Sequence, residues 1–146
     1  MPLGAFIANK KLMRNLAKDP ALGHITTFGG HPVCCAAGMA AMKVLLKEKL
    51  HDSVHFKEQL FHQLLQHPKI KAIRSNGLLL ALEFDNFEIS KKIVDQCINA
   101  TDGSRVLTDW FLFAPECMRI APPLTISKKE IRKASSTICA MIDSVF

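Results

Sequence analysis

Residues 70–84 read IKAIRSNGLLLALEF and contain two apolar segments on either side of Asn76-Gly77. The segments Ile70–Arg74 and Leu78–Phe84 have the composition of strands, and Asn-Gly is the strongest short turn signal in the chain. This stretch therefore predicts a β-hairpin. With the elements expected after it, the order ββαββα is typical of a compact α+β domain.

Helical patterns flank this hairpin. Pro32 suits the first position of a helix that extends to Leu45. A second helix is expected over about Ser53–Gln66, continuing from the first with a kink near His51. The other expected elements are a short buried strand at 3–8, a helix at 10–18 stopped by Pro20 and Gly23, a helix from an Asp85/Glu88 capping box to about Ala100, strands at 106–113 and 118–120 joined through Pro115, and a last helix opened by a Ser127/Glu130 capping box.

The composition changes at about Lys47–His51. Residues 1–48 are rich in small side chains and resemble the edge of a larger unit, whereas residues 49–146 have the size of an ordinary small domain. We therefore expect two parts. The Ala-rich stretch Ala36–Leu45 is expected to leave an apolar face exposed, which favours self-association.

Composition and charge exclude several classes of protein. The 146 residues are 49% hydrophobic and 22% charged, which indicates a packed globular chain without a membrane span. The net charge of +6 comes from scattered basic pairs and Tyr is absent, so no nucleic-acid partner is expected. The five cysteines form no CxxC motif and no basic leader precedes the apolar N-terminus, so a reduced, cytoplasmic setting is expected.

Two segments contain candidate binding residues. The loop Thr26–Pro32 combines hydroxyls, two glycines and a helix start, which suit either a phosphate site or a plain helix cap. Arg119 precedes Pro122-Pro123, and a fixed arginine suits carboxylate recognition, although a surface arginine at a strand end is the alternative. His51 and His55 stand four residues apart without a third ligand, so no metal site is expected.

The order and separation of these segments resemble the C-terminal part of the class III pyridoxal-phosphate aminotransferases, the ornithine/acetylornithine/4-aminobutyrate type. The matching segments are Pro2–Ala5, Thr26–Pro32, Ala36-Ala37, Arg74 with Gly77-Leu78, Glu83, and Arg119–Leu124. The resemblance spans essentially the whole chain. It implies an α/β fold: the end of a fold-type I large domain (residues 1–48, with the linking helix) followed by an α+β small domain (residues 49–146) with a short, mainly antiparallel sheet covered by helices.

The resemblance also implies a function for the complete enzyme, which moves an amino group between an amino acid or ω-amine and a 2-oxo acid. Thr27, with Thr26 beside it, would bind the phosphate of pyridoxal 5'-phosphate across a dimer interface, and Arg119 would bind the substrate carboxylate. Ile25 and His31 depart from the family pattern of Gly and Asn, although His31 is still expected to cap the helix.

The Schiff-base lysine of this family lies just before the segment that matches Pro2–Ala5, so no catalytic residue is expected within this chain. Lys10 and Lys11 are the nearest lysines and are expected to be solvated. The isolated chain is therefore expected to be inactive and to hold no cofactor covalently. The alternatives are a non-catalytic dimerisation or interaction module and one half of a split enzyme.

Overall fold

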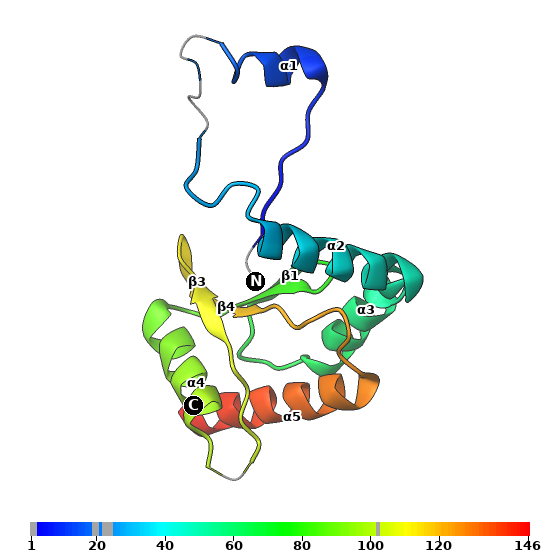
Figure 1. Ribbon diagram of the computed structural model, residues 1–146. Helices are drawn as coiled ribbons and strands as arrows, with labels where there is room; N and C mark the ends of the chain where they lie inside the picture. Colours follow the sequence, from blue (N-terminus) through cyan, green and yellow to red (C-terminus); the bar gives the residue numbers. More distant parts are fainter. Residues whose placement is uncertain (1–2, 19–20, 22–24, 102) are drawn as a thin grey trace. The chain divides into compact units, whose positions relative to one another are not determined.

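The computed structural model describes residues 3–18, 21, 25–101 and 103–146. The chain divides into two compact units, Met1–Lys49 and Leu50–Phe146 (Figure 1). Within the described residues, no helix combines the length and the apolar character that a membrane crossing requires.

The described residues of the first unit form two helices, α1 (Lys10–Arg14) and α2 (Pro32–Lys47). The strand expected at residues 3–8 is wrong: this segment has no regular structure, and Ile7 is 95% exposed. No other described segment pairs with it, and an apolar run without a partner strand cannot form a ladder. Helix α1 ends at Arg14, earlier than expected, and Pro20 and Gly23 lie outside the described residues.

Helix α2 begins at Pro32 as expected, because its first position needs no N–H. None of its residues is buried, and Val33, Met39 and Leu46 are among its exposed apolar side chains. The expected continuation into the next helix is wrong. Lys49 has a φ of +48°, which interrupts the helical backbone before the 3₁₀ helix η1 (Leu50–Ser53) and helix α3 (Val54–Leu64).

The second unit contains a four-stranded antiparallel sheet in the order β1-β2-β4-β3 (Figure 1). Strands β1 (Ala72–Asn76) and β2 (Leu79–Glu83) form the predicted hairpin, although both strands are shifted from their expected bounds. Asn76 pairs with Leu79, so the turn is Gly77-Leu78 and not Asn76-Gly77, and Gly77 supplies a φ of +62° at the first turn residue. Glycine suits this position because a two-residue hairpin turn requires positive φ there.

Strands β3 (Asp109–Phe111) and β4 (Ala114–Ile120) form the second hairpin. Their expected bounds are wrong, because β3 is shorter than 106–113 and β4 begins before Met118. Pro115 lies inside β4 instead of joining the strands. Proline cannot donate to a ladder, and the register jumps from Trp110↔Met118 to Phe111↔Ala114, which leaves Pro115 without a partner in β3.

The remaining helices are α4 (Phe87–Asn99) and α5 (Lys128–Val145). The capping box expected at Asp85 and Glu88 is wrong: Asn86 is the N-cap, and its side chain accepts a hydrogen bond from the Ile89 amide at 3.1 Å. Asp85 instead pairs with Lys71 at 2.7 Å.

The second predicted capping box is confirmed. The Ser127 hydroxyl accepts from the Glu130 amide at 3.2 Å, and the Glu130 carboxylate accepts from the Ser127 amide at 2.7 Å.

Helices α3, α4 and α5 pack on one side of the sheet, as Figure 1 shows. Alternate strand residues point toward them, and this face forms the core. The fully buried members include Leu80, Leu82 and Met118 from the sheet, and Phe61, Ile93, Ile131, Ile138 and Ile142 from the helices. The residues between them in the strands, such as Ala81 and Arg119, point to the opposite face.

We predict that Leu82→Ala lowers the free energy of unfolding of the second unit by about 2–5 kcal/mol, because the truncation leaves a cavity in a tightly packed core. Leu79→Ala is the matched control on the same strand. Its side chain is 48% exposed, so its effect should stay near about 0.5 kcal/mol. Urea unfolding measures both, and equal losses would contradict this assignment of faces.

Candidate functional site

The loop before α2 contains Thr26 and Thr27, both exposed. Two turns shape it: the Gly29 amide donates to the Thr26 carbonyl and the His31 amide to the Phe28 carbonyl, each at 3.2 Å. Gly30 has a φ of +72°, which favours glycine. A Cβ at Gly29 would stand 2.6 Å from the Thr26 hydroxyl, so that side chain fits closely over the glycine.

The first turn of α2 has backbone N–H groups for which the helix itself provides no acceptor. Residue His31 occupies the N-cap position but makes no side-chain cap bond, so the expectation that it caps the helix is wrong. Its Nδ1 atom is buried and has no partner among the described residues. The amides of Val33 and Cys34 belong to the first turn, where a helix supplies no acceptors. Hydroxyls, free amides and a helix N-terminus fit the phosphate of a cofactor.

Arg119 lies in β4, with Ala81 and Asp109 as its register partners on the two neighbouring strands. Its Nε donates to Asp109 Oδ1 at 2.7 Å, and its Nη2 donates to Asp109 Oδ2. The hydrogen bond to Asp109, followed by the charge of that carboxylate, holds the pKa of Arg119 above its ordinary value. Both side chains remain accessible, with 43% of Arg119 and 49% of Asp109 exposed.

A second arginine shares this face of the sheet. Arg74 Nη1 donates to the Glu83 carboxylate and Nη2 donates to Cys117 Sγ at 3.2 Å. Burial raises the pKa of the Cys117 thiol, and the nearby Arg74 charge opposes that rise only in part. The thiol therefore stays protonated near neutral pH. A cavity of about 460 Å³ is lined by both arginines and by Phe111 and its neighbours.

The structure defines each predicted site separately. Thr26 and Thr27 share one loop of the first unit, whereas Arg119 belongs to the second unit. Asp109 is a member of the arginine site that the sequence did not indicate. The nine residues between Asp109 and Arg119 follow no motif, and only the β3–β4 register brings the two side chains together.

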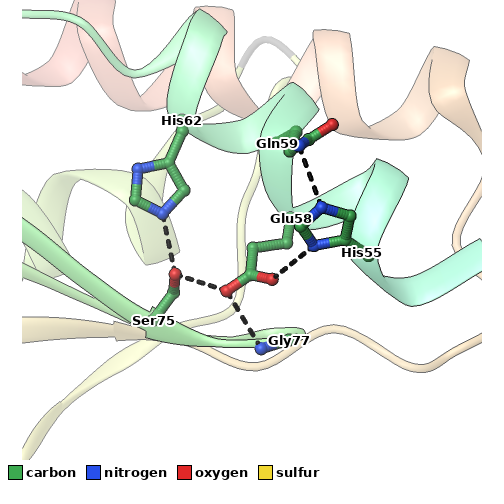
Figure 2. Close-up of polar contacts among 6 residues, drawn as sticks. All are labelled: His55, Glu58, Gln59, His62, Ser75 and Gly77. Atoms are coloured by element: carbon green, nitrogen blue, oxygen red, sulfur yellow. Dashed lines mark hydrogen bonds and ion pairs between the residues drawn. The ribbon is translucent and has the colours of Figure 1, made fainter.

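A polar network links α3 to the first hairpin (Figure 2). The Glu58 carboxylate accepts from the Ser75 hydroxyl at 2.6 Å and from the Gly77 amide at 3.1 Å, while His62 Nε2 lies 2.7 Å from the same hydroxyl. His55 lies 3.6 Å from Glu58. The sequence analysis missed this network because its members lie on separate elements.

The direction of these hydrogen bonds excludes a nucleophilic serine. Ser75 has one hydroxyl proton, which it donates to Glu58, so His62 must donate to Ser75 and cannot act as its base. The network therefore holds α3 on the hairpin. His51 pairs with Asp52, and the described residues contain no group of three or more side chains that could hold a metal ion.

The chain resembles known aminotransferases. A family model described as "Aminotransferase class-III" matches residues 1–142. An ornithine aminotransferase from Toxoplasma gondii ME49 is 31% identical, with a TM-score of 0.70 over 88% of this chain and 30% of that chain. A second Toxoplasma gondii structure, described with partial occupancy of PLP at its active site, is 29% identical, with a TM-score of 0.72 over 90% of this chain and 31% of that chain.

An (S)-enantioselective omega-transaminase from Thermomicrobium roseum is 24% identical, with a TM-score of 0.73 over 94% of this chain and 33% of that chain. The chain thus spans about a third of the length of the solved structures it matches. These likenesses confirm the predicted fold class, a mixed α/β chain with a small antiparallel sheet covered by helices, as in fold-type I aminotransferases.

We predict that the ionisation of Glu58 makes the free energy of unfolding depend on pH. The Ser75 hydroxyl, more than the Gly77 amide and His55, holds the pKa of Glu58 below its ordinary value. The carboxylate therefore stabilises the fold fully above the unfolded pKa of about 4.3, and this contribution disappears as the pH falls through the lower folded pKa. Urea unfolding at pH 7 and at about pH 3 should show that Glu58→Gln destabilises the fold more at pH 7 than at pH 3.

Glu48→Gln is the control, because this exposed glutamate lies outside the network. It should leave the urea midpoint unchanged at both pH values. A Glu58→Gln effect of equal size at pH 7 and pH 3 would contradict the linkage.

Proposed function

Because the chain belongs to the class-III aminotransferase family, we propose that it is the C-terminal part of an enzyme that moves an amino group between an amino acid or ω-amine and a 2-oxo acid. Residues 1–48 correspond in this proposal to the end of the large cofactor-binding domain, and residues 49–146 to the small domain. The observation that carries the proposal is the accessible, oriented Arg119 guanidinium on the sheet face opposite the core.

Thr26 and Thr27 are proposed to bind the phosphate of pyridoxal 5'-phosphate. When bound, this cofactor supplies the electron sink for amino-group transfer. The loop's two hydroxyls and the free amides at the start of α2 suit a dianionic phosphate, and Gly29 leaves room for the close turn. Thr27 would act across the interface of a homodimer, where its exposed position makes it available to a partner.

Arg119 is proposed to bind the carboxylate of the amino or oxo acid. A planar guanidinium suits a carboxylate because two parallel N–H groups match its two oxygens. The two register partners fix the backbone beneath it, and Pro122-Pro123 follow the strand end. The arginine would thereby orient the substrate while the cofactor performs the chemistry.

The Schiff-base lysine is proposed to come from the part of the family fold that this chain does not span. Lys10 and Lys11 are exposed on α1, and we assign neither of them to the cofactor aldehyde. The isolated chain is accordingly proposed to be inactive and to act in the cytoplasm only as part of a complete enzyme.

A second candidate function is a non-catalytic dimerisation or interaction module, and one half of a split enzyme is a related form. The absence of any buried residue in α2 favours it, because an apolar helix with that exposure needs a partner surface.

We predict that Arg119→Lys, in an enzyme assembled from this chain and the rest of the family fold, weakens binding of amino and oxo acids about ten- to hundredfold. One charge-assisted fork is worth about 1.5–3 kcal/mol. The affinity for the cofactor should hardly change, because its phosphate is assigned to Thr27. Substrate titrations and cofactor titrations measure the two effects, with Arg132→Lys on the exposed face of α5 as the control. Unchanged substrate binding would remove the carboxylate role.

We also predict that pyridoxal phosphate added to the isolated 146-residue chain produces no lysine-dependent absorption band. A visible spectrum recorded at equal concentrations of chain and cofactor is the measurement, with Lys10→Ala and Lys11→Ala as comparisons. A stoichiometric band that disappears in one of these variants would show that the chain supplies its own lysine.

A further inference from the structure

The pairing between Arg119 and Asp109 uses only one edge of the guanidinium. The contacts involve Nε and one proton of Nη2. A guanidinium carries five N–H donors in a fixed plane, so three donors remain on Nη1 and Nη2. Among the described residues, no acceptor is hydrogen-bonded to Nη1. The outer edge therefore keeps the two parallel donors that a second carboxylate needs.

Two contacts fix Asp109 relative to Arg119, and a third lies beside the guanidinium. The two residues are register partners on β3 and β4, so their backbones are held side by side. The Thr108 hydroxyl donates to the Arg119 carbonyl, which ties the start of β3 to the same residue. On the same face, the Phe111 ring centroid lies 6.0 Å from the guanidinium carbon.

From this geometry we infer that Asp109 is a positioning residue: it holds the Nε edge of Arg119 so that the Nη edge is presented to the carboxylate of a 2-oxo or amino acid. This inference rests on the proposed carboxylate role of Arg119. A free arginine side chain samples many rotamers, and fixing it costs free energy on binding. The hydrogen bonds to Asp109 restrict the arginine rotamer before the ligand binds, so less conformational entropy is lost on binding.

The negative charge of Asp109 acts in the opposite direction, because it repels an incoming carboxylate. Both side chains are about half exposed, so salt screens this repulsion. Salt weakens the orientation of the arginine less, because Arg119 is held by two direct hydrogen bonds to Asp109. A comparison at two ionic strengths therefore separates the positioning effect from the repulsion.

The test uses the full 146-residue chain, labelled with ¹⁵N, and follows the Nε–H signal of Arg119 by NMR. Pyruvate is the probe, and methyl pyruvate, which lacks the carboxylate, is the control ligand. Titrations at about 0.15 M and about 0.5 M salt compare the wild-type chain with Asp109→Ala. Asp95→Ala is the matched control, since Asp95 forms an equally exposed ion pair with Lys91 at 2.7 Å elsewhere in the unit.

We expect pyruvate, but not methyl pyruvate, to shift the Arg119 signal. Asp109→Ala should weaken pyruvate binding about two- to tenfold at both salt concentrations, and Asp95→Ala should leave it unchanged. The Nε–H proton of Arg119 should also exchange faster with water in Asp109→Ala, because its hydrogen bond to Asp109 is lost. A role of Asp109 in stabilising the fold alone would not change this exchange rate.

Binding that is unchanged or tighter in Asp109→Ala at high salt would overturn the positioning role while leaving the carboxylate role of Arg119 intact. No carboxylate-dependent shift in the wild-type chain would overturn both. If circular dichroism shows that Asp109→Ala does not fold, Asp109→Asn, which keeps the shape but loses the charge, is measured under the same criteria.

Discussion

The antiparallel register between β2 and β4 determines both the core and the candidate site. It pairs Leu80 with Ile120 and Leu82 with Met118 on the helix-covered face, and Ala81 with Arg119 on the other. A slip of one residue would turn Arg119 into the apolar core and Met118 to the solvent. Because an unpaired charge in a core is very costly, this register is strongly specified.

The same alternation gathers charged residues on the face opposite the helices. Arg74 and Glu83 form one pair and Arg119 and Asp109 another, with the small Ala81 between the two arginines in the register. A core face built by α3, α4 and α5 thus supports a polar face suited to small acids. In the proposed function, the second unit would supply the carboxylate-binding surface, and the cofactor chemistry is assigned to the part of the family fold outside this chain.

Local sequence signals predicted those elements that local interactions determine. The Gly77 turn, the start of α2 at Pro32 and the Ser127 capping box are each fixed by neighbouring residues, and each was confirmed. The strand expected at residues 3–8 was wrong because a strand depends on a partner. The predicted N-cap of α4 was also wrong, because the side chain of Asn86, and not that of Asp85, accepts the hydrogen bond from the first turn.

Contacts across the sheet could not be predicted in this way. Asp109 reaches Arg119, and Glu58 reaches Ser75, only after the hairpins have formed. The roles of Thr27 and Arg119 were expected from the local sequence together with the family resemblance, and they stay predictions.

The central claim is that this chain presents Arg119 to the carboxylate of an amino or oxo acid in an aminotransferase. A crystal structure of the assembled enzyme with a bound 2-oxo acid tests it most directly. We predict carboxylate oxygens about 2.7–2.9 Å from Nη1 and Nη2 of Arg119, with Asp109 still on the Nε edge. A carboxylate bound elsewhere, with Arg119 paired only to Asp109, would contradict the claim.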